Sequence, residues 1–152
     1  MDTAGFLAGE RAAIVSEAED AFARLREGRY ETVAASEIRE RLDLLFGQLV
    51  EAVSRRSLSG VIEYAGTVAR ERFEAGYDLS EVQAAFNALE AATWTRIIAG
   101  LEADELAEAL GLVSTVLGAA KDALGRQYVS LATRSHAPSL DLRALFDGTD
   151  GV

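Results

Sequence analysis

The sequence predicts an all-α fold of about five helices, packed as a single bundle or in a globin-like arrangement. The chain has 152 residues and one proline, Pro138, so no earlier residue interrupts a helix by lacking a backbone N–H. Apolar residues recur every three or four positions, and no stretch shows the period of two expected of a half-buried strand. Hydrophobic residues make up 49% of the chain, which is enough to give one domain a full core.

The first two predicted helices lie in the N-terminal third of the chain. The apolar pattern predicts a helix over residues 6–25, and Gly28 is its predicted stop. A second helix is predicted over residues 38–53. Ser36 is its candidate N-cap, because a serine hydroxyl can accept a hydrogen bond from the first free backbone N–H groups.

The third and fourth predicted helices have clearer ends. The third begins within residues 57–59 and stops at Gly76. The fourth begins after Asp78, which can accept from the first backbone N–H groups, and Glu81 follows three residues later as in a capping box. Gly100 is predicted to end or kink this helix.

The fifth predicted helix is the longest, and a tail follows it. Its apolar stripe covers residues 106–131, and acidic residues within 102–105 suit the positive end of the helix dipole. The pattern fails after Ala132, which predicts one helical domain over residues 1–134 and a tail over 135–152. The tail carries an amphipathic segment that would dock on its own bundle or on a partner, with apolar residues Leu140, Leu142, Leu145 and Phe146.

Composition excludes several kinds of site and partner. With no Cys and one His, the chain cannot form a disulfide framework, a zinc finger or a paired-His metal site, so we expect no metal and no cofactor, haem included. The net charge of −10 leaves no positive surplus for phosphates, so neither nucleic acid nor a membrane is an expected partner. No signal peptide or membrane-spanning run is visible, and the expected location is the cytoplasm.

The sequence also predicts that the chain is not an enzyme. It lacks the Gly-x-Ser-x-Gly, Gly-x-x-x-x-Gly-Lys-Ser/Thr and Gly-x-Gly-x-x-Gly motifs of nucleophilic and phosphate-binding sites. The acidic residues within 102–108 are interpreted as a solvated helix start, and Lys121 as a surface lysine. A helical enzyme that uses carboxylates alone is kept only as a third hypothesis.

Three glycines stand seven residues apart in the fifth predicted helix: Gly111, Gly118 and Gly125. Each costs about 1 kcal/mol relative to alanine in a helix interior. A spacing of seven places them on one stripe, which favours the close approach of another helix. That helix belongs either to the same chain or to a second copy in a dimer.

Aromatic residues give a second candidate surface. Trp94 stands beside the main apolar stripe of its helix, so the second half of that helix is apolar over a wide arc. This arc is interpreted as ordinary core, as a dimer surface or as part of an apolar ligand pocket. In the last case the pocket is lined by Tyr64, Phe86 and Trp94.

One segment resembles a known family. Over residues 70–94, a helix stop is followed by an aromatic residue, a helix start and an apolar helix with an aromatic near its middle, carried by Gly76, Leu79, Glu81, Val82 and Trp94. This segment resembles the N-terminal helical sensor domain of RsbRD-type stressosome co-antagonists, to which domains of some histidine kinases and PucR-type regulators are related. The resemblance implies a non-enzymatic sensory or protein-interaction domain, often dimeric. It carries over no catalytic residue and no ligand contact.

These observations lead to one main hypothesis and an alternative. The main hypothesis is a helical regulatory domain of stress signalling that works without catalysis, by homodimerisation and by binding a protein partner. It is expected to stand alone, because no output domain follows before Val152. The alternative is a protein that binds a small apolar ligand in a pocket between helices.

Overall fold

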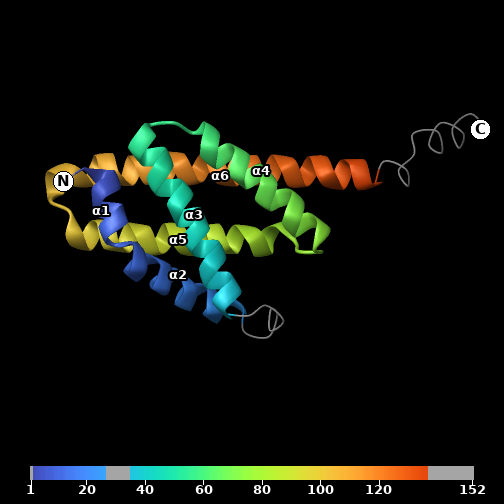
Figure 1. Ribbon diagram of the computed structural model, residues 1–152, viewed down its shortest axis with the longest axis horizontal. Coiled ribbons are helices and arrows are strands. Elements are labelled where there is room, and N and C mark those ends of the chain that lie inside the picture. The colour runs from blue at the N-terminus through green and yellow to red at the C-terminus, as the bar shows by residue number, and fades with distance from the viewer. Residues whose placement is uncertain (1, 27–34, 137–152) are drawn as a thin grey trace, which may run out of the picture.

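The computed structural model describes residues 2–26 and 35–136, and these residues form six α-helices (Figure 1). No strand occurs in these two ranges, so the predicted all-α class is confirmed. The helices are α1 (Thr3–Gly9), α2 (Arg11–Arg26), α3 (Ala35–Arg55), α4 (Ser59–Glu74), α5 (Leu79–Gly100) and α6 (Ala103–His136).

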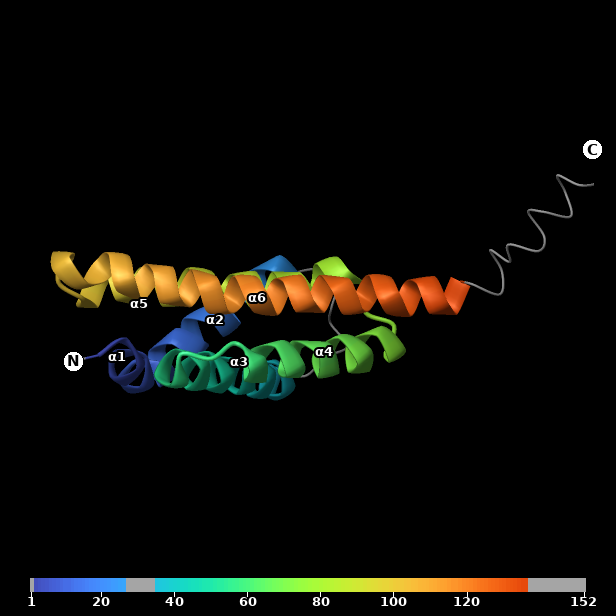
Figure 2. The same cartoon turned by 90° about the horizontal axis from the view of Figure 1, so that it is seen from above.

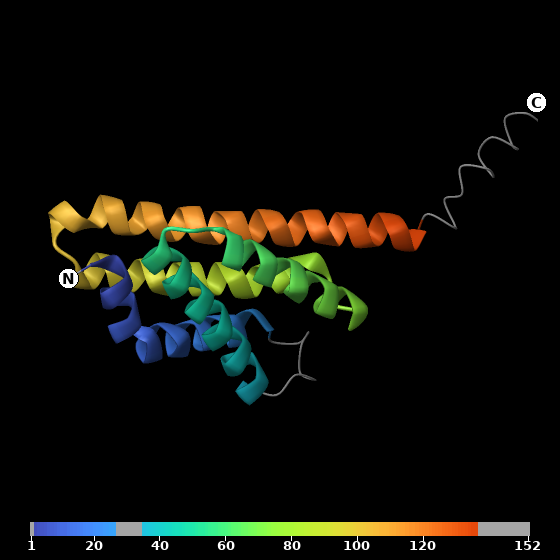
Figure 3. The same ribbon diagram turned by 45° about the horizontal axis from the view of Figure 1, so that its top comes forward.

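The helices lie in two layers (Figure 2). α5 and α6 run antiparallel and side by side in one layer, while α1, α3 and α4 form the other. α2 passes between the layers and packs mainly on α5, whereas α4 packs along α6. α6 is the longest helix, with 34 residues, and its C-terminal end extends past the neighbouring helices (Figure 3).

One apolar core fills the space between the layers. All six helices contribute to it, as the recurring apolar residues of the sequence predict. Its large, almost fully buried side chains are Leu7, Ile14, Phe46, Leu49, Val61, Leu89, Ile97, Val113, Leu117 and Leu124. Each of these, once truncated to alanine, would lose contacts on every side, at a typical cost of about 2–5 kcal/mol.

The N-terminal region differs from the prediction of a single helix over residues 6–25. The structure has two helices there, separated by a turn at Glu10. The ring of Phe6 packs directly on Gly100, where an added Cβ would lie 2.8 Å from two ring carbons. α1 therefore turns away from the axis of α2 to reach the end of α5 (Figure 1), and Gly9 lowers the helix propensity next to the turn.

The predicted stops at Gly76 and Gly100 are confirmed, and the first is a Schellman motif. Gly76 has φ +89°, its N–H donates to the carbonyl of Phe73 at 3.1 Å, and the N–H of Tyr77 donates to the carbonyl of Arg72 at 2.9 Å. Glycine fits this left-handed backbone because it has no Cβ to clash with the next carbonyl.

The predicted helix starts are less accurate. Asp78 does precede α5, but its side chain forms no capping bond, and its carboxylate accepts from the hydroxyl of Ser80 at 2.9 Å. Ser36 is not the N-cap of α3, since that helix already includes Ala35. α6 continues to His136, past the residue where the apolar pattern fails.

Some predictions fall on residues that the structure does not describe. The stop at Gly28 and the tail segment over 139–147 lie outside the described ranges. The apolar tail residues Leu140, Leu142, Leu145 and Phe146 therefore stay a prediction, and so does the division into residues 1–134 and 135–152.

Candidate functional site

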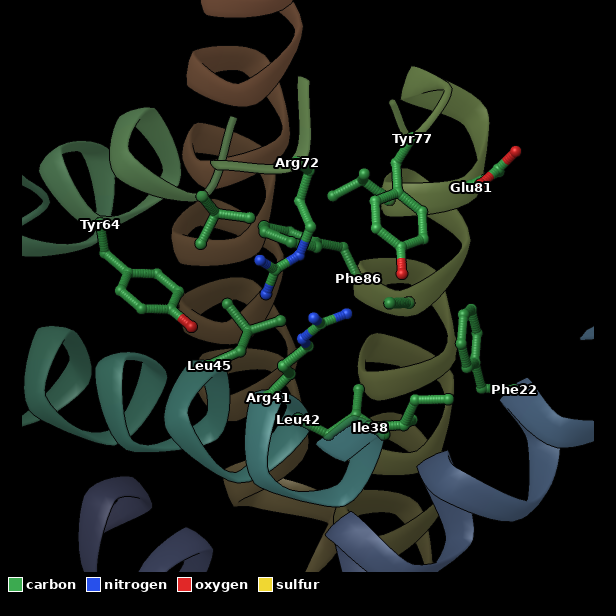
Figure 4. A pocket seen from close by; sticks show the side chains of 13 residues that line it. Phe22, Ile38, Arg41, Leu42, Leu45, Tyr64, Arg72, Tyr77, Glu81 and Phe86 are labelled. Carbon is green, nitrogen blue, oxygen red and sulfur yellow. The ribbon is translucent and has the colours of Figure 1, made fainter. Parts of the chain in front are cut away.

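A pocket lies between α3, α4 and α5, near the turn that joins α4 to α5 (Figure 4). Its cavity measures about 70 Å³, and the open space around it, including solvent at the mouth, brings the total to about 650 Å³. The apolar part of the wall comes from four helices and consists of Phe22, Ile38, Leu42, Leu45, Val68, Val82, Ala85 and Phe86. Such a wall suits the apolar part of a small molecule.

Polar groups converge on one side of this pocket (Figure 4). The guanidinium groups of Arg41 on α3 and Arg72 on α4 point toward each other, and the hydroxyls of Tyr64 and Tyr77 point into the same region. The side chain of Glu81 points away from it. The guanidinium carbon of Arg41 lies 5.8 Å from the centre of the Tyr77 ring, which is cation–π distance.

Arg72 is the more shielded of the two arginines, with 16% of its side chain exposed against 29% for Arg41. Its one ion pair among the described residues is with Glu71, at 3.6 Å, and that carboxylate is 61% exposed. Burial lowers the pKa of Arg72, and the positive charge of Arg41 lowers it further. Arginine stays protonated at neutral pH despite such a shift, so the pocket holds a poorly compensated cation.

Arg41 and Tyr64 complete the electrostatics. Arg41 forms an ion pair with Glu37, one turn earlier on α3. Burial raises the pKa of Tyr64, so its hydroxyl remains a neutral donor over the physiological range. The pocket thus presents two guanidinium groups and two hydroxyls, all of which can donate hydrogen bonds.

Tyr128 on α6 fixes the turn that carries Tyr77. Its hydroxyl donates to the carbonyl of Tyr77 at 2.9 Å, and its ring meets Phe73 edge to face, with centres 5.7 Å apart. Burial raises the pKa of Tyr128 to about 12. The wall of the pocket is therefore attached to the opposite layer of the molecule.

A second candidate surface is the exposed side of α5 and α6, here called the outer face. It consists of Ala91, Trp94 and Ile98 on α5 and Gly111 and Gly118 on α6, all exposed. Trp94 is 38% exposed and Ile98 is 57% exposed. Trp94 does not line the pocket, so the structure separates it from the other two predicted aromatic residues, Tyr64 and Phe86, which do.

The two helices of the outer face are joined by a polar bridge. The Nζ of Lys121 donates to Glu90 at 2.8 Å and to Asn87 at 3.1 Å. Because residues three or four apart share a helix face, this bridge places the stripe of Trp94 on α5 beside that of Gly118 on α6.

The glycine stripe has no close neighbour within the described chain. A Cβ added at Gly111, Gly118 or Gly125 would meet nothing within 4 Å. The described helices therefore give no intramolecular reason for glycine at these positions, and a helix from a second copy stays a prediction.

The sequence did not single out Arg41 or Arg72, and Tyr77 entered only as the aromatic residue that follows the helix stop at Gly76. A signal was present, because Arg72 continues the buried stripe formed on α4 by Val61, Ala65 and Val68. An arginine on such a stripe is unusual, since arginine is almost never fully buried without a partner. The stripe on α4 could not show that Arg41, on α3, lies close to Arg72.

The described residues contain no cluster of three or more His, Cys, Asp or Glu side chains that could hold a metal ion. No helix built from them has both the length and the apolar character needed to cross a bilayer.

The fold and the two surfaces define a small all-α domain with a pocket between its layers and an apolar outer face. Residues 7–140 match the family of the RsbT co-antagonist protein RsbRD N-terminal domain, and the chain belongs to this family. The resemblance carried by Gly76, Leu79, Glu81, Val82 and Trp94 is thereby confirmed. It is a regulatory family of stress signalling. No curated protein and no solved structure shows significant similarity to the chain.

Proposed function

We propose that the chain is a non-catalytic regulatory domain that forms a homodimer through its outer face and binds a protein partner of a cytoplasmic stress-signalling pathway. Family membership supports the regulatory role. The dimer rests on one observation, which is that the large exposed apolar side chains Trp94 and Ile98 lie beside the exposed glycines Gly111 and Gly118. The predicted tail segment stays a candidate for contact with the partner.

The outer face has the features of a self-complementary surface. Trp94 and Ile98 are exposed on α5, while α6 has no side chain at Gly111 and Gly118. In a two-fold dimer each patch meets the same patch of the other copy. The projecting side chains of one copy can then cover the glycines of the other, which gives a reason for glycines that cost helix stability in one chain.

The test is the oligomeric state of Trp94→Glu measured by sedimentation equilibrium. We expect the native chain to dimerise and the variant to remain monomeric, because a carboxylate at the centre of an apolar interface loses its hydration. Circular dichroism checks that the variant is folded. Leu44→Glu is the matched control, since Leu44 is 53% exposed on α3, in the other layer, and this variant should dimerise normally.

Gly118→Leu is a gentler version of the same test. A side chain at this position has room within one chain, since its Cβ meets nothing within 4 Å. The variant should therefore fold, with dimer formation weakened at least about tenfold by the blocked approach. A native chain that is monomeric at all concentrations would contradict the dimer, as would a Gly118→Leu variant with unchanged association and melting temperature.

A second candidate function is the binding of a small molecule in the pocket. The observation that favours it is the meeting of Tyr64 and Phe86 with two arginines around one apolar cavity. The sequence predicts an apolar ligand. The two arginines add positive charge to the lining of the pocket, which a purely apolar ligand would leave without a partner.

A further inference from the structure

We propose that the pocket binds a small amphiphilic carboxylate, with its head group held between Arg72 and Arg41 and its apolar chain lying on the wall around Phe86. This inference names the ligand class of the second candidate function and rests on it. It does not depend on the homodimer.

The polar groups of the pocket converge on one region. Two guanidinium groups and two tyrosine hydroxyls point into one region of the pocket (Figure 4). All four can donate hydrogen bonds, whereas the guanidinium groups cannot accept any. A group that satisfies them together must be an acceptor with several lone pairs, and a carboxylate fits the planar fork of arginine in a bidentate manner.

The charge of Arg72 is shielded from solvent. With 16% of its side chain exposed, its guanidinium has lost much of its hydration, and its carboxylate neighbour Glu71 lies 3.6 Å away and mostly in solvent. The hydrogen bonds of the described residues include none donated by the Arg72 guanidinium to another side chain. A shielded charge without close compensation is costly, and Arg41 on the opposite wall adds repulsion. A bound anion between them would offset both.

The charge and the apolar surface of the pocket together suit an amphiphilic anion. Arg41 is already paired with Glu37 on its own helix, so Arg72, whose carboxylate neighbour is mostly exposed, is the one poorly compensated charge, and a single such charge suits a monoanion. The pocket places an apolar wall beside these polar groups, which suits a ligand with a polar head and a short alkyl or aryl chain. A ligand that is only apolar would leave the arginines without partners.

The experiment is calorimetric titration of the full chain with octanoate. Its three comparison probes are octanamide, which lacks the charge, acetate, which lacks the chain, and octyl phosphate, which carries a different anionic head. Because a hydrogen bond to a charged group is among the stronger ones, we expect octanoate to bind at least about tenfold more tightly than octanamide or acetate. Octyl phosphate should bind more weakly than octanoate.

Two variants locate the head group. Arg72→Gln should weaken octanoate binding at least about tenfold while leaving octanamide binding unchanged. Arg41→Gln should act in the same direction, and it serves if the first variant does not fold. Arg70→Gln is the matched control, because Arg70 is exposed on the same helix and does not line the pocket. It should bind octanoate like the native chain.

The outcomes separate the inference from the proposals before it. Equal binding of octanoate and octanamide would overturn the carboxylate while supporting an apolar ligand. Tighter binding of octyl phosphate would overturn the carboxylate in favour of a phosphate. If no probe binds, both the ligand class and the second candidate function fail, while the homodimer is judged by sedimentation alone.

Discussion

The two turns on either side of α4 have the same backbone motif but different residues at its key position. In both, a helix ends with a residue of positive φ, followed by an N–H that donates five positions back. That bond runs from Ser57 to Ala52 at 3.2 Å in one turn and from Tyr77 to Arg72 at 2.9 Å in the other. The left-handed residue is Arg56 in the first, with φ 52°, and Gly76 in the second.

The two turns also differ in how far they are exposed to solvent. The Gly76 turn is held by the buried hydroxyl of Tyr128 and carries Tyr77 into the pocket. The Arg56 turn lies at the surface, where Arg56 pairs with Glu108 and both side chains are more than half exposed. The turn that shapes the pocket has glycine at its left-handed position and is held by Tyr128. The surface turn has arginine at the same position and tolerates the strain.

The largest effect on this comparison is expected for Gly76→Ala. A Cβ at φ +89° approaches the following carbonyl, so we expect a loss of about 1–2 kcal/mol in the free energy of unfolding, measured with urea. Gly60→Ala on α4 is the control, because its Cβ has only an ordinary contact at 3.8 Å, and alanine there should be neutral or stabilising. Equal stability of the two variants would show that the Gly76 turn does not need glycine.

A smaller effect is expected from ionising Tyr128. Its folded pKa of about 12 exceeds the ordinary value of 10.0, so folding favours the neutral hydroxyl. The stability it contributes is complete below pH 10 and is lost as the pH rises toward 12, by about 1 kcal/mol per pH unit. The urea midpoint of the native chain should fall over this interval. The midpoint of Tyr128→Phe should fall less, and a parallel fall in both would contradict the assignment.

The smallest effect is expected for Arg56→Gly. Glycine removes about 1 kcal/mol of left-handed strain, which stabilises the folded state. This gain is partly offset because glycine also gives the unfolded chain more conformational freedom. The exposed ion pair with Glu108 contributes little. We expect a net gain of about 0.5 kcal/mol, seen as a higher melting temperature. Arg56→Ala loses the same ion pair but keeps the strain, so it should melt below Arg56→Gly.

Local signals in the sequence predicted the C-terminal ends of α4 and α5 correctly. Gly76 and Gly100 were found because glycine acts on the backbone where it stands. The turn at Glu10 was missed, because it goes with a contact between Phe6 and Gly100, residues that lie far apart in the sequence. The capping bond predicted for Asp78 was wrong, and its carboxylate accepts from the hydroxyl of Ser80 instead.

Some residues of the candidate site were found from the sequence and others were not. Tyr64 and Phe86 were selected as apolar aromatic residues on helix faces, and both line the pocket. Arg41 and Arg72 were not, since helical period places a residue on a face but does not say which face it meets. Their convergence depends on how α3 crosses α4, which is a property of the packed core.

The position of Trp94 has a spectroscopic consequence. It is the one tryptophan of the chain, it lies on the outer face, and it does not line the pocket. Its indole emission therefore responds to water at the outer face and is insensitive to direct contact with a molecule in the pocket. The protein thus carries an intrinsic optical probe that distinguishes association of two chains from occupancy of the cavity, without any added label.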